Sequence, residues 1–176
     1  MKATFDDFYH RYHQDLYQFV FYMVKNKQET EDIVQEVYIR VIRSYHNFKG
    51  DSSEKTWLFS IARHVTYDYF RKLKRKRNRL ISFFNWSKAD ETLSSNHPLP
   101  EEVALLDDEM KRLYNCLDHC TIDQKQVIIL RYLQEFTIQE TSDILGWSTS
   151  KVKTTQHRAV KFLQQKMGNA DEKEDV

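Results

Sequence analysis

The sequence predicts an all-α protein made of two small helical domains joined by a flexible linker. Hydrophobic residues make up 40% of the 176-residue chain, which suffices for compact cores, and only 3 glycines and 2 prolines interrupt it. Apolar side chains recur at intervals of three and four residues over 5–79 and 101–167, a spacing typical of amphipathic helices. The pattern fails over 80–100, where both prolines lie, and we expect the linker there.

The first domain, residues 1–79, is predicted to contain three helices. The first covers about 5–24, and the second begins near Glu29, after a polar break, and ends near Tyr45. Ser53 is a suitable N-cap for the third helix. That helix ends in a strongly basic run, 71–79, in which seven of nine residues are Lys or Arg. The predicted inward side chains are Phe5, Phe8, Tyr12, Leu16, Phe19, Val20, Met23, Ile33, Val34, Val37, Tyr38, Val41, Ile42, Trp57, Leu58, Ile61, Ala62, Val65 and Tyr69.

The second domain, residues 101–168, begins with a helical pattern and continues with two strong helix-start signals. Residues 121–124 and 137–140 both fit the capping box, in which the N-cap hydroxyl and the third-position side chain bond to each other's backbone amides. The helix after the second box ends near Gly146, which can adopt the left-handed conformation that terminates helices. A last helix is expected over about 149–167.

The net charge of +1 conceals a strong segregation of charge along the chain. Residues 1–79 carry a balance of +6, residues 80–120 of −5, residues 121–167 of +3 and the last nine residues of −3. Two basic blocks separated by an acidic one indicate two modules that bind polyanions. The acidic tail, 169–176, is expected to be frayed.

Several classes of protein are excluded by what the sequence lacks. No Gly-rich phosphate loop is present, and no Ser or Cys stands beside a recognisable base, so we expect no enzyme, no catalytic residue and no cofactor. Cys116, His119 and Cys120 are possible metal ligands, but a structural zinc ion needs four, and packing at a helix end is the preferred interpretation. The presence of only two cysteines in the chain is typical of a protein from a reducing cytoplasm. We expect a soluble cytoplasmic protein without signal peptide or membrane span.

The segment from Thr137 to Gln165 predicts a helix-turn-helix, because a short helix ends at a glycine and a longer helix follows a tight turn. Such a second helix binds the major groove of DNA through short polar side chains and flanking cations. An ordinary helical hairpin with a solvated basic face is the alternative. The outward side chains of the second helix are Lys151, Lys153, Thr154, Thr155, His157, Arg158 and Lys161.

The third helix and the loop before it combine aromatic and basic side chains. Aromatic rings beside a cationic track are typical of surfaces that bind single-stranded nucleic acid. The alternative is that most of these rings belong to the core, which we prefer for Trp57 and Tyr69.

Three segments together resemble a known family. Asp32–Tyr38, then Phe48–Ser52 with Thr56–Ala62, and finally Gly146–Ala159 have the order and spacing found in extracytoplasmic-function (ECF) sigma factors, a subfamily of the sigma-70-type RNA polymerase sigma factors. The resemblance covers about 5–166. It implies a region 2 helical bundle and a region 4 helix-turn-helix, which together direct promoter recognition and transcription initiation.

Two shorter segments, Tyr12–Leu16 and Ser53–Trp57, further resemble the SigX-type subgroup of that family. The chain also departs from the family pattern. His64 stands where Asn is frequent, and Gln156 stands where an apolar residue is usual. These departures put inherited promoter preferences in doubt and leave the predicted fold unchanged.

The resemblance implies a role for three sets of residues. Core RNA polymerase would be bound by Asp32, Gln35 and Glu36, which lie on one face of the second helix. The minus-ten promoter element would be bound, with one base flipped out of the stack, by Phe48, Lys49, Gly50, Asp51, Ser52, Trp57, Phe59, Ile61, Arg63, His64, Arg71 and Lys72. The minus-thirty-five element would be bound by Lys151, Lys153, Thr154, Thr155, His157, Arg158 and Lys161.

The resemblance also implies a membrane-anchored anti-sigma factor as a partner, which would hold the protein at the membrane, and it implies no small-molecule substrate. The main alternative is a stand-alone helix-turn-helix transcriptional regulator. Such a protein needs a dimer interface or a ligand pocket to set its half-site spacing, and the long linker and the aromatic and basic third helix fit it poorly. A protein that binds only other proteins would not need two basic blocks.

Overall fold

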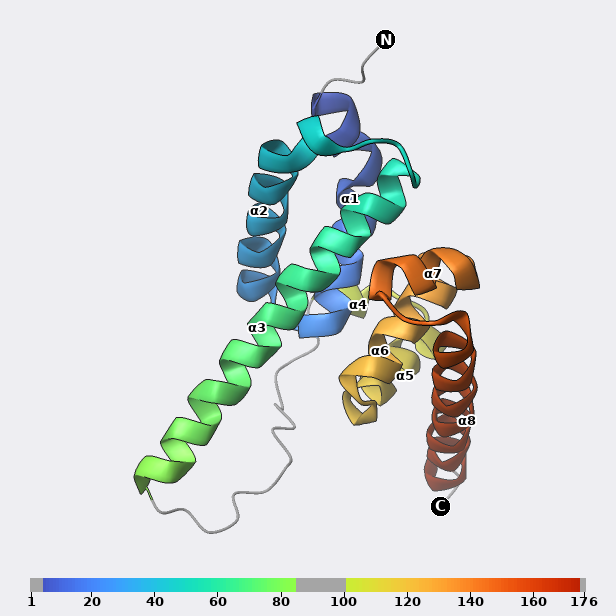
Figure 1. The fold of residues 1–176 in the computed structure, drawn as a ribbon. Helices are drawn as coiled ribbons and strands as arrows, with labels where there is room; N and C mark the ends of the chain where they lie inside the picture. Colours follow the sequence, from blue (N-terminus) through green and yellow to red (C-terminus); the bar gives the residue numbers. More distant parts are fainter. Residues whose placement is uncertain (1–4, 85–100, 175–176) are drawn as a thin grey trace.

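The structure is a computed structural model that describes residues 5–84 and 101–174, and every regular element in these two ranges is helical (Figure 1). Among the described residues, no helix has the length and apolarity that a bilayer crossing requires. In chain order the helices are α1 (Phe5–Val24), α2 (Lys27–Ser44), α3 (Glu54–Phe84), α4 (Glu101–Ala104), α5 (Asp108–Cys116), α6 (Ile122–Ile128), α7 (Ile138–Leu145) and α8 (Thr149–Glu174), with short helical turns at Tyr45–Asn47, Leu117–His119 and Ile129–Leu133.

The N-terminal unit is a bundle of α1, α2 and α3. Each helix contributes side chains that are fully shielded from solvent between the three helices. Examples are Leu16 of α1, Val37 of α2 and Leu58 of α3. The Ser53 hydroxyl accepts a hydrogen bond from the Thr56 amide at 3.0 Å, which confirms the predicted N-cap of α3.

The start of α2 differs from the prediction. The Asn26 side chain accepts a hydrogen bond from the Glu29 amide at 3.0 Å and caps the helix, so α2 begins two residues before the predicted Glu29. Lys25 joins α1 to α2 with a left-handed backbone, φ 58°. The polar break of the sequence is therefore a tight helix–cap–helix corner.

The outermost ends of α1 and α2 correct two predicted core positions. Phe5 is 43% exposed and Ile42 is 61% exposed, because no helix in the described ranges covers these two side chains. Together with Phe8, Val41 and Tyr45 they line an open apolar depression of about 320 Å³.

The length of α3 also exceeds the prediction. It continues to Phe84, five residues into the predicted linker, because no Gly or Pro interrupts 54–84 and its Lys, Arg and Leu residues favour helix. Residues 71–80 are all exposed, and this half of α3 extends beyond α1 and α2 (Figure 1). The remainder of the predicted linker, 85–100, lies outside the described residues.

The C-terminal unit is built from α5 to α8. Both predicted capping boxes are present, at Thr121 and at Thr137. Gly146 has φ 65° and ends α7, as predicted, and Ala159 of α8 is fully buried. The last helix continues to Glu174, where we predict a frayed tail, because residues 170–174 include the strong helix formers Ala, Glu and Lys.

The two units pack against each other along α3, which contacts α7. The rings of Phe59 and Phe136 meet edge to face, with centroids 4.9 Å apart, and both side chains are buried. At a second contact, the Phe21 and Tyr114 rings stack at 6.0 Å. The buried side chains of the two units therefore form one continuous apolar cluster.

Polar contacts flank this apolar boundary. The Gln134 amide donates to the Gln18 carbonyl oxygen at 2.7 Å, and Lys55 donates to the Gln134 backbone oxygen at 3.4 Å. Lys25 forms an ion pair with Asp118, N to O 2.9 Å, and its ammonium group lies 3.9 Å from the centroid of the Tyr114 ring. Each contact joins the N-terminal bundle to the C-terminal unit.

Candidate nucleic-acid interface

The outward face of α2 carries Asp32, Gln35 and Glu36, one helical turn apart. Asp32 and Gln35 are exposed, whereas Glu36 is half-buried because Arg40 donates to its carboxylate at 2.8 Å. The same face borders a groove of about 460 Å³ between α2 and α3, which Asp68 also lines. The three predicted polymerase contacts thus lie together on a polar, mostly acidic surface.

The loop between α2 and α3 is held by aromatic rings. The Phe48 ring lies 5.0 Å from the Trp57 ring, and Tyr45 packs against both. Gly50 has φ 78°, a conformation that side-chain-bearing residues rarely adopt, so the loop turns sharply there. Its remaining predicted contact residues lie at the surface, with Lys49, Gly50 and Asp51 exposed and Ser52 half-buried.

The predicted contacts on α3 divide between two sides of the helix. Residues spaced by three, four and seven share a side, and this spacing defines the outer face of α3, next to the loop. Trp57 and Ile61 are half-buried there, while the more distant members are exposed. The outer face consists of Trp57, Ile61, His64, Arg71 and Lys72.

Phe59 and Arg63 lie on the opposite side, the inner face of α3, and the burial of Phe59 corrects the predicted site. Phe59 is fully buried between Phe19 and Phe136, because it is rotated by about 200° from Trp57. Arg63 is half-buried over the Tyr67 ring and lies where α3 meets α6. Neither side chain faces the loop, so Phe59 is a core residue and Arg63 belongs to the boundary between the units.

His64 is exposed on the outer face. Its Nδ1 lies 2.6 Å from the Ser60 carbonyl oxygen, which requires that Nδ1 carry the proton and donate it. In the neutral ring Nε2 is then an acceptor. This bond fixes the tautomer of the imidazole on the surface of α3.

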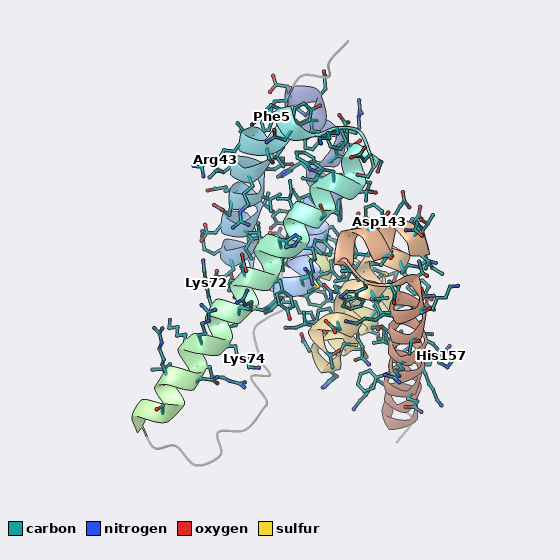
Figure 2. The ribbon with its side chains drawn as sticks, viewed as in Figure 1. Phe5, Arg43, Lys72, Lys74, Asp143 and His157 are labelled. Carbon is teal, nitrogen blue, oxygen red and sulfur yellow. The ribbon has the colours of Figure 1, made fainter. Side chains whose placement is uncertain are left out.

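The second basic surface lies on α8. Lys153, Thr154, His157, Arg158 and Lys161 are all exposed, and His157 lies on the side of α8 that is turned away from α3 (Figure 2). The remaining predicted contacts flank this surface. Lys151 is exposed, with its ammonium group 3.7 Å from the Trp147 ring centroid, and Thr155 is half-buried.

The sequence prediction omitted the side chains that α6 adds to this surface. Thr121 and Gln124, the capping box of α6, line a groove of about 510 Å³ together with Ser150, Thr154 and Arg158 of α8. The capping box was the available signal, since it places polar side chains at the start of a helix. Only the fold brings that helix start beside α8.

The Gln156 side chain forms a polar bridge. Its carbonyl oxygen accepts from Arg131 Nε at 2.9 Å, and its amide nitrogen donates to the Tyr132 hydroxyl at 3.1 Å. Arg131 also donates to the Phe136 backbone oxygen. The bridge joins α8 to the π-helical turn at Ile129–Leu133.

The titratable groups at the boundary between the units are perturbed by burial. Burial lowers the pKa of Lys25 and of Lys125, and in both cases it outweighs the effect of Asp118. Burial raises the pKa of the Cys120 thiol to about 11. Both cysteines are free thiols, and within the described part of the chain no group of three His, Cys, Asp or Glu side chains is placed to hold a metal ion.

The two surfaces together are typical of a protein that binds nucleic acid at two separate sites. One unit carries an aromatic loop and a basic helix, and the other carries a helix-turn-helix. Models of two known families match the same parts: "Sigma-70 region 2" matches residues 8–76, and "Sigma-70, region 4" matches residues 110–163.

Comparison with curated proteins agrees with the two family models. The chain is 54% identical over 167 residues to the ECF RNA polymerase sigma factor SigX of Bacillus subtilis strain 168, covering 95% of this chain and 85% of that protein. It is 29% identical over 175 residues to the RNA polymerase sigma factor YlaC of the same strain, covering 99% of this chain and 98% of YlaC. The chain therefore belongs to the ECF subfamily of sigma-70-type sigma factors.

Solved structures support the same fold. The sigma factor RpoE of Bartonella quintana, in a complex with the anti-sigma factor NepR, superposes with a TM-score of 0.68 at 22% identity, covering 92% of this chain and 97% of that one. As an ECF sigma factor, the protein binds core RNA polymerase and promoter DNA and directs transcription initiation. The family regulates transcription, and this assignment replaces the alternative of a stand-alone helix-turn-helix regulator.

Proposed function

We propose that this sigma factor contacts polymerase and promoter through three separate surfaces, on α2, on α3 with its preceding loop, and on α8. One observation carries the assignment: except for Phe59 and Arg63, the side chains expected at each contact lie together at or near the surface. Each surface differs in chemistry, which suits acidic docking, single-strand binding and duplex binding respectively.

Core polymerase is bound by the face of α2. Asp32, Gln35 and Glu36 present carboxylate and amide groups on one side of the helix, which suits a basic groove on the partner. Arg40 orients Glu36 and takes up part of its charge. Asp32, which accepts only from Gln28 at 3.2 Å among the described side chains, is the more available carboxylate.

The minus-ten element is bound by the loop 48–52 and the outer face of α3. Flipping a base out of a duplex costs a few kcal/mol, which stacking on an aromatic ring can offset with about 1–3 kcal/mol per base. The Phe48 and Trp57 rings supply this surface beside the sharp turn at Gly50. His64 contributes an acceptor at Nε2, and Arg71 and Lys72 contact phosphates.

The minus-thirty-five element is bound by α8. Lys153, Thr154, His157 and Arg158 face base edges in the major groove, while Lys151, Thr155 and Lys161 flank them near the phosphates.

The remaining features of the proposal follow from family membership. Region 2 occupies residues 1–84, where α3 ends, and a linker occupies residues 85–100. Region 4 occupies residues 101–168, and the acidic tail, 169–176, continues α8 as far as Glu174. We propose a cytoplasmic protein without catalytic chemistry, cofactor or small-molecule substrate. A membrane-anchored anti-sigma factor is proposed as its partner, supported by the structural similarity to a sigma factor solved with an anti-sigma factor.

The docking surface is tested by charge reversal. Asp32→Lys with Glu36→Lys should weaken binding to core polymerase at least tenfold in a pull-down, because two carboxylates on the docking face become cations. Asp6→Lys with Glu135→Lys, two exposed carboxylates elsewhere, changes the net charge equally and should leave the affinity unchanged. Equal affinities for the two double variants would refute the assignment of α2.

A further inference from the structure

The second half of α3 carries a row of cations that begins with Lys72, a phosphate contact of the minus-ten surface, and continues past it into residues that no surface above includes. Lys72, Arg75, Lys76 and Arg79 follow a spacing of three, four and seven residues, which places them on one side of the helix. With Leu80 they line a shallow open groove of about 480 Å³. All four are exposed, and none forms an ion pair with a carboxylate in the described parts of the chain. We name these four residues the basic stripe.

The basic stripe continues the outer face of α3. Arg75 and Arg79 lie within about 40° of Trp57 around the helix axis, so the loop and the stripe face the same way. Lys74, in contrast, is rotated by about 160° from Lys72, and the two labelled side chains leave the helix on different sides (Figure 2). This half of α3 projects beyond the bundle, where nothing described covers the stripe (Figure 1).

The helix itself sets the reach of the stripe. About 18 residues separate Trp57 from the middle of the stripe, which is roughly 27 Å of α-helix. The same length corresponds to about 8 base pairs of duplex. Residues 71–80 include no aromatic side chain, so the stripe offers charge without a ring on which an unpaired base could stack.

We propose that the basic stripe binds the phosphate backbone of intact duplex promoter DNA, roughly 8 base pairs upstream of the flipped minus-ten base. The direction is upstream because the chain continues from the end of α3 towards the unit that binds the minus-thirty-five element. This inference rests on the proposed role of the loop and outer face of α3. The stripe adds affinity that does not depend on base sequence.

The test compares two double variants of equal charge on opposite sides of the same helix. Arg75→Gln with Arg79→Gln removes two cations of the stripe, and Lys74→Gln with Arg77→Gln removes two cations outside it. Each is combined with core polymerase and titrated against a promoter fragment that the wild-type holoenzyme has selected from a randomised library. Each lost phosphate contact should lower the slope of log affinity against log salt by about 0.9, so the stripe variant should lose about 1.8 and the control variant little.

Neutral methylphosphonate linkages then locate the contact. Placed about 8 base pairs upstream of the flipped base, they should weaken binding of the wild type and leave the stripe variant unaffected. Equal salt slopes for the two double variants would overturn the proposal, as would a stripe variant whose loss appears in binding to core polymerase without DNA. If the wild-type holoenzyme selects no promoter at all, the proposed function of the chain fails together with this inference.

A second, independent observation concerns the hydroxyl of Tyr132. Arg131 donates to Gln156 Oε1, which fixes the side-chain amide so that its nitrogen donates to the Tyr132 oxygen. The phenol is thus an acceptor in this bond, and no group in the described residues accepts the phenol's own proton. Tyr132 is 52% exposed, and Gln156 lies one turn after Lys153 and next to His157. We infer that the Tyr132 hydroxyl donates to a DNA phosphate at the edge of the α8 surface.

Replacing Tyr132 by Phe tests this inference, because only the hydroxyl is lost. A hydrogen bond to a charged acceptor predicts a loss of about tenfold or more in affinity for the minus-thirty-five duplex. Since a neutral donor releases no counterion, the salt slope should not change, and the loss should be equal for all base sequences. Tyr67→Phe, on α3, serves as the control. Unchanged affinity would overturn the assignment, and a changed base preference would show a base contact in place of a phosphate contact.

Discussion

Replacing Lys25 by Met should loosen the packing of the two units. The minus-ten and minus-thirty-five elements are centred about 25 base pairs apart, which is roughly 85 Å of duplex. The longest element of the packed structure, α3, has 31 residues and is roughly 46 Å long, about half of that span. One chain in the packed arrangement therefore cannot contact both elements, and the contacts of Lys25 oppose promoter binding.

The size of the effect follows from what Lys25 contacts. Methionine keeps the apolar length of the side chain, 12% exposed in lysine, and removes the ammonium group. The ion pair contributes at most about 1 kcal/mol because the Asp118 side chain is 58% exposed. The contact with the Tyr114 ring contributes about 1 kcal/mol and the bond to the Tyr114 carbonyl about 1.5 kcal/mol, and burial of the charge offsets part of both. A net loss of about 2 kcal/mol is a shift of about thirtyfold towards the open arrangement.

Alkylation of a buried cysteine measures this shift. Thr66 is 2% exposed on the inner face of α3, where Ile122 and Gln126 of the C-terminal unit cover it. With Thr66→Cys in a chain whose native cysteines are replaced by serine, the alkylation rate is proportional to the open fraction. Lys25→Met should raise this rate about thirtyfold.

Lys74→Met, which removes an exposed lysine elsewhere on α3, should leave the rate unchanged. Equal rates in the Lys25 and Lys74 variants, with circular dichroism showing both folded, would refute the role given to Lys25.

The remaining predictions concern DNA contacts and a buried thiol. Arg158→Ala should cost about 1–3 kcal/mol and relax preference at one minus-thirty-five position, whereas Lys161→Ala should weaken all sequences equally; uniform losses in both, measured on a promoter library, would make Arg158 a phosphate contact. His64→Asn should change base preference at one minus-ten position while the melting temperature stays the same, and identical transcription profiles on a randomised minus-ten library would remove His64 from the site. Burial raises the pKa of Cys120 to about 11, so at pH 9 only about one Cys120 thiol in a hundred is ionised. The rate at which Cys120 is alkylated in the folded chain should therefore rise tenfold per pH unit up to about pH 11. A rate that levels off near pH 9 would contradict the burial of this thiol.

Local signals in the sequence predicted most of the fold. The capping boxes at Thr121 and Thr137, the N-cap at Ser53 and the left-handed Gly146 depend on interactions within a few residues, and all four are present. Spacing alone was less reliable at the edges of the bundle. Ile42 has the spacing of a core residue and is exposed because no element in the described part of the chain covers it.

For the candidate site, the sequence predicted which residues share one face of a helix and little more. Helical spacing placed Trp57, Ile61 and His64 on one side of α3, but assigning Phe59 to the same site ignored that two residues turn a helix by about 200°. The packing of the units was not predictable, because it depends on which surface of α3 the C-terminal unit covers. Lys25 in particular gives no signal of a buried contact in the sequence.

The most direct test of the whole account is run-off transcription with purified core RNA polymerase from a bacterium that carries a SigX-type relative. Core polymerase alone should give no specific transcript from a library of random promoter templates. With the chain added, transcripts should begin at defined positions downstream of a shared minus-ten and minus-thirty-five pair, and this pair should be lost in the Asp32→Lys/Glu36→Lys variant. Stable binding of the chain to promoter duplexes with no specific transcription and no binding to core polymerase would contradict the account.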